Sequence, residues 1–231
     1  MANLCIIPAR GGSKRIPRKN IKLFLGKPII AYSIETAQKS GLFDEVMVST
    51  DDAEIAEIAV SYGAKIPFLR DKKTASDFAT TYDVVEEVVL QYQQQGIKFE
   101  YICCIYPCAP FVSNEKLSDS FNVLTSNDFD SVFPVMPFGF PIQRALNVTQ
   151  DKKTSFFYPE FSLSRSQDLQ NSYHDAGQFY WMNIENCLRE KKILTENSGS
   201  IIISELEGQD IDNDVDWKLA ELKYELLQSI K

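Results

Sequence analysis

Short apolar runs alternate with stretches of helical period over most of the chain. The apolar runs predict strands at 4–7, 45–50, 65–69, 131–136, 178–184 and 200–206, and a further strand that starts at Tyr101. Apolar residues at helical spacing predict helices at 28–39, 82–95, 115–124 and 217–230, one that follows Asp51 and Asp52, and a short one at 187–192. Because strands that alternate with amphipathic helices are typical of βαβ units, the pattern predicts an α/β domain with a mostly parallel sheet flanked by helices.

This pattern breaks between residues 137 and 172. The stretch contains several prolines, an aromatic group between Phe156 and Phe161, and no helical period. Its polar turns alone favour disorder, whereas its aromatic side chains favour an ordered segment. We expect a single domain over residues 1–231 that carries residues 137–172 as an excursion from the sheet.

Size and charge narrow the class of protein. The chain has 231 residues, 44% of them hydrophobic, and a net charge of −8. A chain of this length and hydrophobic content can form the core of one large domain, and the acidic net charge argues against non-specific nucleic-acid binding. No run approaches the roughly 18 apolar residues that span a bilayer, and the first residues read as a strand, which is not a signal-peptide pattern. We expect no nucleic-acid or membrane partner and a cytoplasmic location.

The cysteines indicate neither a disulfide framework nor a zinc site. They lie mostly inside strand-like runs, at Cys5, Cys103, Cys104, Cys108 and Cys187. Their number is odd and none of them form a C-x-x-C pair. We expect reduced thiols in the core.

The first 34 residues are strongly basic although the whole chain is acidic. They contain no acidic side chain and seven basic ones, at Arg10, Lys14, Arg15, Arg18, Lys19, Lys22 and Lys27. Most follow the strand at 4–7, so their loop leaves the carboxyl edge of the predicted sheet, where open α/β sheets bind ligands. Gly11 and Gly12 lack Cβ atoms, which lets backbone N–H groups approach phosphate oxygens. The segment predicts a bound anion, and the alternative is a solvated basic turn.

Two common glycine-loop patterns are absent from this segment. The only Gly-Lys pair, Gly26 and Lys27, is followed by a proline, which excludes the P-loop pattern. Gly11 and Gly12 are followed by Ser-Lys-Arg without a third glycine, which excludes the dinucleotide-binding pattern.

The sequence Ile-Pro-Ala-Arg-Gly-Gly-Ser-Lys-Arg-Ile-Pro-Arg-Lys-Asn, which ends at Asn20, resembles the N-terminal signature of the CMP-sialic acid synthetase family. These cytidylyltransferases activate nine-carbon 2-keto acids with CTP. The resemblance implies catalytic roles for Arg10 and Lys19. It also implies that the triphosphate is held by Ala9, Arg10, Gly11, Gly12, Ser13, Lys19 and Asn20. Nucleotidyl transfer depends mostly on positioning and charge neutralisation, which a cluster of cations supplies.

The same resemblance implies that the loop after the predicted strand at 65–69 contacts the rest of the nucleotide. The residues implied are Arg70, Ser76, Thr80 and Thr81. Two alternatives stay open: Arg70 as a surface salt-bridge partner, and Thr80 and Thr81 as caps of the next helix.

Candidate sugar contacts come from two further matches. Tyr106 lies where the sialic acid enzymes usually have Gln, which puts sialic acid itself in doubt as the substrate; the alternative is an ordinary aromatic at the core edge. Arg-x-Gln-Asp at Arg165, Gln167 and Asp168 also matches the family, and Arg suits a carboxylate because it offers two parallel hydrogen bonds. The following Tyr-His-Asp-Ala-Gly-Gln-Phe-Tyr-Trp, with His174 and Asp175, is most similar to the pseudaminic acid branch. His174 also suits a structural role.

Four aspartates at alternate positions, from Asp210 to Asp216, offer hard oxygen ligands. The family's Asp-x-Asp motif matches Asp210 and Asp212, and the resemblance implies that they bind Mg²⁺ and act in catalysis. An EF-hand is excluded because Val215 stands where the sharp turn needs glycine. Asp214 and Asp216 fit a capping role at the last helix better, and an all-oxygen site does not suit zinc.

The resemblance implies a Rossmann-like fold of the nucleotide-diphospho-sugar transferase type, and a homodimer in which the excursion reaches over the partner's active site. The expected reaction joins CTP to a nonulosonic acid, most specifically pseudaminic acid, and releases pyrophosphate. The alternatives are CMP-sialic, CMP-legionaminic or CMP-Kdo synthesis or, in a different class, a nucleotide-binding module without turnover. The hypothesis requires the basic loop and the aspartate pair to face one cleft.

Overall fold

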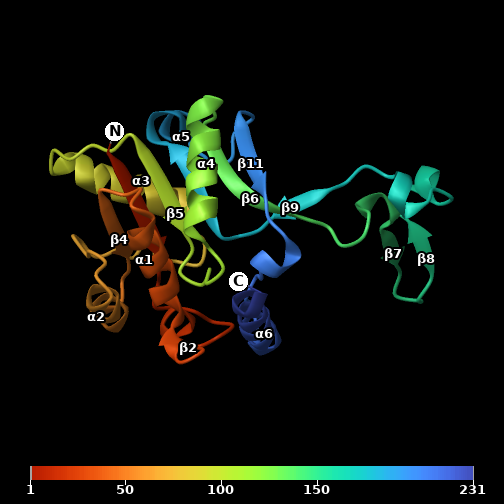
Figure 1. The fold of residues 1–231 in the computed structure, drawn as a ribbon, viewed down its shortest axis with the longest axis horizontal. Coiled ribbons are helices and arrows are strands. Elements are labelled where there is room, and N and C mark those ends of the chain that lie inside the picture. The colour runs from red at the N-terminus through yellow and green to blue at the C-terminus, as the bar shows by residue number, and fades with distance from the viewer. Residues whose placement is uncertain (1, 231) are drawn as a thin grey trace.

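A seven-stranded sheet forms the centre of the molecule in the computed structural model, which describes residues 2–230 (Figure 1). The strand order is β11-β6-β10-β5-β1-β4, with β9 paired to β6. The strands are β1 (Asn3–Pro8), β4 (Glu45–Ser49), β5 (Tyr101–Ile105), β6 (Ser131–Pro137), β9 (Tyr173–Asp175), β10 (Phe179–Asn183) and β11 (Ser198–Ile202). Five of them run parallel, whereas β9 and β10 run antiparallel to their neighbours. The predicted Rossmann-like, mostly parallel sheet is confirmed.

Helices cover both faces of this sheet. The helices are α1 (Ile29–Ser40), α2 (Ala53–Ser61), α3 (Thr81–Gln94), α4 (Asn114–Ser126), α5 (Ile184–Glu190) and α6 (Asp214–Ile230). Alternate side chains of β1 point to opposite faces: Cys5 and Ile7 pack with α1, α2 and α4, and Leu4 and Ile6 pack with α3 and α5. All four are fully buried, which explains why the strand reads as an uninterrupted apolar run. Within residues 2–230, no helix is both long and apolar enough to cross a membrane.

A third apolar cluster lies below the carboxyl edge of the sheet and fixes the end of the basic segment. It joins α6 to Ile16 of the basic segment and to the hairpin of β2 (Leu23–Phe24) and β3 (Lys27–Pro28). This hairpin follows the short 3-10 helix η1 (Lys19–Ile21). Phe24 is fully buried there, with its ring against Trp217 at a centroid distance of 5.8 Å. The last helix is thereby held against the first segment of the chain.

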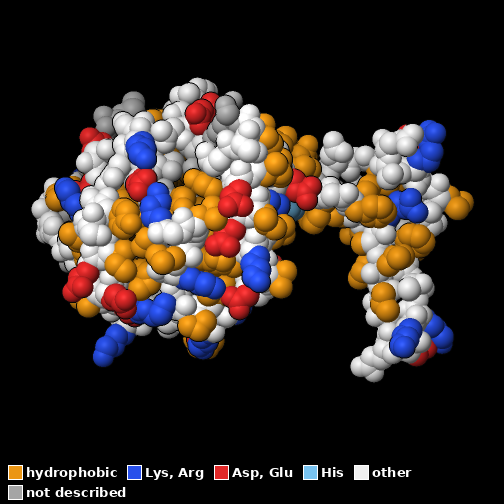
Figure 2. Space-filling view, turned by 60° about the horizontal axis from the view of Figure 1, so that its bottom comes forward, with side chains coloured by type: hydrophobic (Ala, Val, Ile, Leu, Met, Phe, Trp, Pro, Cys, Tyr) orange, Lys and Arg blue, Asp and Glu red, His pale blue; other side chains and the backbone are white. Residues whose placement is uncertain are grey.

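Residues 138–172, here called the arm, leave the body between β6 and β9 (Figure 1). The arm contains a small hairpin of β7 (Leu146–Val148) and β8 (Thr154–Phe156) and three 3-10 helices, η2 (Ile142–Arg144), η3 (Pro159–Phe161) and η4 (Ser166–Asp168). Figure 2 shows apolar side chains over much of its surface. The predicted excursion from the sheet is therefore ordered and projects from the body.

Several predicted boundaries are wrong. The strand expected at 65–69 is a single bridge between Met47 and Lys65, because Pro67 has no N–H to continue a ladder. The strand expected at 200–206 runs from Ser198 to Ile202, and the helix expected at 187–192 is α5, which starts at Ile184. The five cysteines are free, as expected, and four of them are buried.

Candidate active site

A cleft of about 670 Å³ opens at the carboxyl edge of the sheet, beyond the ends of β1 and β5. Five segments line it: the basic loop after β1, residues 70–84, the turn after β5, Gly177 between β9 and β10, and residues 209–211 before α6. Figure 2 turns this edge toward the viewer and shows basic and acidic side chains interspersed over it. The cleft lies at the carboxyl edge of the sheet, where the sequence predicts a bound anion.

One wall of the cleft is basic. Of the seven cations in the first 34 residues, four line the cleft: Arg10, Lys14, Arg15 and Lys19. Lys19 is the most buried of these four, with 19% of its side chain exposed, and its ammonium donates to the Ile211 carbonyl and lies 3.9 Å from Asp212. Of the aspartate pair that the hypothesis places at one cleft with the basic loop, Asp210 lines the cleft. Asp212 does not line it but contacts two residues that do, Arg15 and Lys19.

The other three cations point to the protein itself. Arg18 pairs with Asp52, Lys22 with Asp214 at 3.0 Å, and Lys27 with Glu35 at 3.0 Å. The charge available to a ligand is therefore smaller than the sequence suggested.

Asp77 is a cleft residue that sequence reasoning missed. Its carboxylate accepts from Arg10 at 2.7 Å and also pairs with Lys14. These hydrogen bonds from Lys14 and Arg10 lower the pKa of Asp77. No local pattern singles out this residue, since it lies more than sixty positions from its partners in a polar loop.

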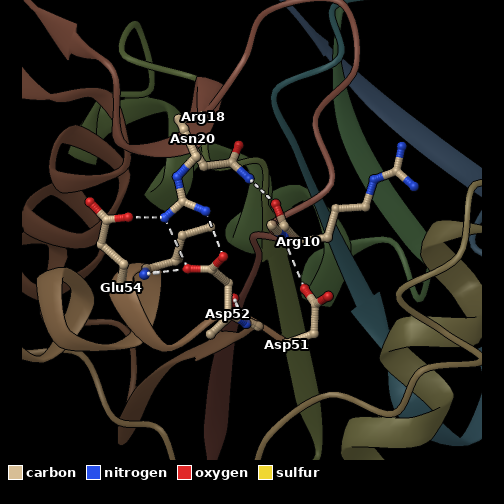
Figure 3. Close-up of polar contacts among 9 residues, drawn as sticks. Arg10, Arg18, Asn20, Asp51, Asp52 and Glu54 are labelled. Carbon is tan, nitrogen blue, oxygen red and sulfur yellow. Dashed lines mark hydrogen bonds and ion pairs between the residues drawn. The ribbon is translucent and has the colours of Figure 1, made fainter.

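The glycine turn is held by side chains (Figure 3). The Asn20 amide donates to the Arg10 carbonyl at 3.0 Å, and the Gly11 N–H donates to Asp51 at 2.9 Å. A Cβ on Gly11 would lie 2.7 Å from Asp52 Oδ2, whereas one on Gly12 would meet nothing within 4 Å. Glycine is therefore required at the first position by close approach. Asp52 caps α2, as expected, but Asp51 binds the loop.

The loop residues that were predicted to hold the triphosphate lie in different environments. Arg10, Ser13, Lys19 and Asn20 line the cleft. Ala9 is fully buried and donates its N–H to the Ser49 carbonyl, so its side chain is part of the core. Gly11 and Gly12 belong to the backbone of the turn and not to the cleft lining.

All four residues predicted for the nucleotide also line the cleft, namely Arg70, Ser76, Thr80 and Thr81. Arg70 is 7% exposed and donates to the Ser49 hydroxyl at 2.9 Å and the Ser49 carbonyl at 2.6 Å. The surface salt-bridge alternative is wrong, because burial holds this guanidinium inside and lowers its pKa. Thr80 does cap α3, in a capping box with Asp83.

Tyr106 lies in the cleft wall at the start of a chain of hydroxyl contacts. Its hydroxyl is 2.9 Å from the Thr81 hydroxyl, and its ring packs against Tyr180. Tyr180 in turn donates to Asp175 at 2.7 Å. Burial raises the pKa of both tyrosines, so both phenols stay protonated. Asp175 acts on the cleft wall through Tyr180 and does not line the cleft itself.

The remaining sugar candidates lie outside the cleft of their own chain. Arg165 and Asp168 pair with each other at 2.8 Å on the arm, beside Gln167, and the side chain of Arg165 is 73% exposed. His174 is on β9, where its ring packs edge-on against Phe138 at 5.0 Å and Nδ1 lies 2.9 Å from the Asp175 carbonyl. These contacts favour the structural role for His174.

The four aspartates from Asp210 to Asp216 separate into two pairs. Asp210 lines the cleft, and Asp212 pairs with Arg15 at 2.5 Å. Asn213 caps the last helix, because its side chain accepts the N–H groups of Val215 at 2.8 Å and Asp216 at 3.0 Å. Asp216 accepts the N–H of Asn213 at 3.1 Å in return, so it takes part in the cap as a partner of Asn213. The capping role expected of Asp214 is wrong, since its side chain pairs with Lys22 from the first turn of α6.

The carboxylates of Asp210 and Asp212 determine which kind of metal site the cleft can form. Within residues 2–230, no group of three or more His, Cys, Asp and Glu side chains is placed to hold a metal ion. Mg²⁺ commonly binds one or two carboxylates and takes its other ligands from water and substrate phosphates. Asp210 and Asp212, beside a basic cleft, fit that mode and do not fit a metal cage built from protein alone.

Cys108 lines the cleft but is not suited to be a nucleophile. Its thiol donates to Asn20 Oδ1 at 3.3 Å, and burial raises its pKa to about 12. The thiolate is the reactive form of cysteine. This thiol is therefore a structural partner of the basic loop.

Comparison with known proteins identifies the family. The cytidylyltransferase family model matches residues 4–197. A pseudaminic acid cytidylyltransferase of Campylobacter jejuni is 43% identical over 226 residues, which cover 98% of this chain and 97% of that protein. A CMP-N,N'-diacetyllegionaminic acid synthase of Legionella pneumophila is 31% identical over 237 residues, which cover 99% of this chain and 98% of that protein.

A solved structure supports the fold independently. The structure of CMP:2-keto-3-deoxy-manno-octonic acid synthetase complexed with CTP aligns with a TM-score of 0.71 at 15% identity, over 99% of this chain and 100% of that one. The matches confirm the resemblance predicted from the basic loop. The chain belongs to the cytidylyltransferase family, and it is a nucleotidyl-transferring enzyme.

Proposed function

We propose that this enzyme is a pseudaminic acid cytidylyltransferase, which joins CTP to pseudaminic acid to give the CMP-sugar and pyrophosphate in an Mg²⁺-dependent reaction. The cleft carries the proposal. Four cations line it together with Asp210, and a buried arginine and four hydroxyl side chains lie on the segment of residues 70–84. A triphosphate suits the first group, and a nucleoside suits the second.

The reaction needs little covalent chemistry from the protein. The anomeric hydroxyl of the sugar acid attacks the α-phosphorus, a new P–O bond forms, and the bond to the β-phosphate oxygen breaks. The hydroxyl proton is released to water as the new bond forms. Arg10 and Lys19 neutralise the β- and γ-phosphates and the departing pyrophosphate.

Mg²⁺ would be held by Asp210 and Asp212. When bound with the nucleotide, it supplies positive charge to the phosphate oxygens. Asp212 also orients two cations of the cleft wall, because it pairs with Arg15 at 2.5 Å and lies 3.9 Å from Lys19.

The choice of sugar rests on the relatives and on the wall around Tyr106. The pseudaminic acid enzyme is 43% identical to this chain, against 31% for the legionaminic acid enzyme. Tyr106 presents a protonated phenol, fixed by Thr81 and Tyr180, where the sialic acid enzymes usually have an amide. An amide and a phenol differ in size and in donor geometry, which changes the sugars that fit.

We also propose that the enzyme is a homodimer formed through the arm. The arm exposes large apolar side chains, including Phe140 at 59%, Phe157 at 61% and Leu163 at 97%. Exposed apolar surface of this kind is typical of protein interfaces. Arg165 would then serve the sugar carboxylate in the partner's cleft, since it lies outside the cleft of its own chain.

A panel of sugar acids tests the proposal. The full-length enzyme is incubated with CTP, Mg²⁺ and pseudaminic, legionaminic, sialic or Kdo acid, and pyrophosphate release is followed. We expect pseudaminic acid to give the highest kcat/KM, by at least about tenfold. A clear preference for another acid would change the assigned sugar and leave the assigned reaction unchanged. Bound CTP without pyrophosphate from any acid would indicate a binding module.

A further inference from the structure

Arg18 is a cation of the basic loop that points away from the cleft. Its guanidinium forms a two-pronged pair with Asp52, at 2.5 Å and 3.0 Å, and also contacts Glu54 (Figure 3). Both acids belong to the start of α2, on the side of the loop that does not face the cleft. The pair with Asp52 raises the pKa of Arg18 and lowers the pKa of Asp52.

The backbone of Arg18 is left-handed, with φ 54° and ψ 29°. A residue with a Cβ rarely adopts this conformation unless its surroundings hold it there. Lys19 and Asn20 follow at once in η1, and both line the cleft. The turn at Arg18 therefore sets the direction in which these two side chains leave the backbone.

The start of α2 contacts both ends of the basic loop, at Gly11 and at Arg18. Asp52 caps the helix through the Ile55 N–H at 3.0 Å, holds Arg18, and lies against Gly11 without room for a Cβ. Asp51 accepts the Gly11 N–H at 2.9 Å. Between these anchors the loop has only a few backbone hydrogen bonds of its own, such as Ser13 N–H to the Gly11 carbonyl.

We propose that Arg18 is a positioning residue for the nucleotide: through Asp52 it fixes the shape of the basic loop, and so places Lys19 and Asn20 for the phosphates of CTP. This inference rests on the proposed function, because it takes CTP as the ligand of the cleft. A guanidinium suits the task since its planar fork binds a carboxylate in one defined orientation.

This role differs from a direct contact with phosphate. The Arg18 guanidinium pairs with Asp52 and Glu54 and does not line the cleft. Its removal alone leaves these carboxylates uncompensated, and an effect of that charge would be reversed in the double variant with Asp52→Asn. We expect the effect on CTP to come from the geometry of the loop, and so to persist in the double variant. Arg18→Leu should add no further loss when Asp52 has already been changed, because both residues act through one contact.

The test compares Arg18→Leu, Arg18→Lys, Asp52→Asn and the double variant Arg18→Leu with Asp52→Asn. We expect Arg18→Leu to raise the KM for CTP about tenfold and to leave the KM for the sugar acid within about twofold. Lys keeps the charge without the fork and should recover part of the loss. Asn still caps α2, so Asp52→Asn should raise the KM for CTP with a small change in Tm. The double variant should match Arg18→Leu.

Arg189→Leu is the matched control, because Arg189 pairs with Glu190 on α5 and should leave both KM values unchanged. An unchanged KM for CTP in Arg18→Leu and Asp52→Asn would overturn the inference, as would equal increases for both substrates or additive losses in the double variant. If Arg18→Leu does not fold, the other two single variants decide. A wild-type enzyme that makes no CMP-sugar would instead overturn the proposed function.

Discussion

The basic loop and the arm are both long segments with little regular structure, yet the chain holds them in opposite ways. The loop is bound on several sides by the body, through Asp51 and Asp52 at α2, Asn20 within the loop and Ile211 before α6. Contacts of the arm lie largely within it, such as Phe157 N–H to the Ala145 carbonyl at 3.0 Å. It leaves large apolar side chains in solvent.

This difference indicates that the loop and the arm depend on different contacts for their conformation. A single chain supplies every anchor of the loop, so one chain can complete the cleft wall that it forms. The arm exposes apolar side chains that its own body does not cover, which is the observation behind the proposed dimer. The following variants test this contrast, from the largest expected effect to the smallest.

Asp210→Asn combined with Asp212→Asn should have the largest effect. Loss of both carboxylates removes the proposed oxygen ligands of Mg²⁺, and kcat should fall about a thousandfold, which corresponds to about 4 kcal/mol. Pyrophosphate release at increasing Mg²⁺ concentration measures this. Asp214→Asn is the control, because Asp214 pairs with Lys22 at 3.0 Å and is 84% exposed. Unchanged turnover in the double variant, with CTP still bound, would remove the metal assignment.

Lys19→Met should lower kcat/KM for CTP about a hundredfold. The loss of one partly buried cation–phosphate contact costs about 2–5 kcal/mol, and methionine keeps most of the side-chain length. Lys22→Met is the matched control in the same segment, since Lys22 lies over Trp217 and binds Asp214. Equal losses in the two variants would show that the whole segment, and not Lys19, is responsible.

Phe157→Ser with Leu163→Ser should weaken self-association at least about tenfold, or about 1.4 kcal/mol, because it removes exposed apolar area from the arm. Sedimentation over a range of protein concentrations measures the dissociation constant. Val60→Ser, on α2, removes an apolar side chain that is 56% exposed on the body and should change nothing. A wild-type enzyme that is monomeric at every concentration would contradict the proposed dimer.

The ion pair of Asp52 should give a small pH effect on stability. Hydrogen bonding to Arg18 lowers the pKa of Asp52 in the folded state, so the stabilisation is fully present above the unfolded value of about 3.9 and is lost as the pH falls through the folded pKa. Solvent screening limits it to about 1 kcal/mol.

Urea unfolding of the wild type and Asp52→Asn at pH 7, 5, 4 and 3 measures this effect. The difference in unfolding free energy should be constant from pH 7 to 5 and shrink below about pH 4. Because Asn retains the cap, a difference that does not change with pH would contradict a contribution from the charge of Asp52.

Local sequence signals predicted the parts of the molecule that local chemistry determines. The glycines and cations of the loop marked the cleft, and the loss of helical period marked the arm. The residues missed were those whose partners are distant in sequence. Asp77 is one such residue, because a single acid in a polar loop has no pattern that points to Arg10 and Lys14.

The direction of β10 could not be predicted from the sequence either. The run that forms β10 is buried on both faces, so it reads the same whether the strand is parallel or antiparallel. Asp51 shows a different limit: an acid just before a helix was expected to act as a cap, but the neighbouring Asp52 takes that role and leaves Asp51 to the loop.

The way in which the arm is inserted has a consequence for how such enzymes can diversify. Its two ends meet at paired residues of the sheet, since Pro137 on β6 lies opposite Tyr173 on β9 in antiparallel register. A short reverse turn between these strands would close the chain with the whole insert deleted. Evolution or protein engineering can therefore lengthen, shorten or exchange the insert while the connectivity of the catalytic body stays intact.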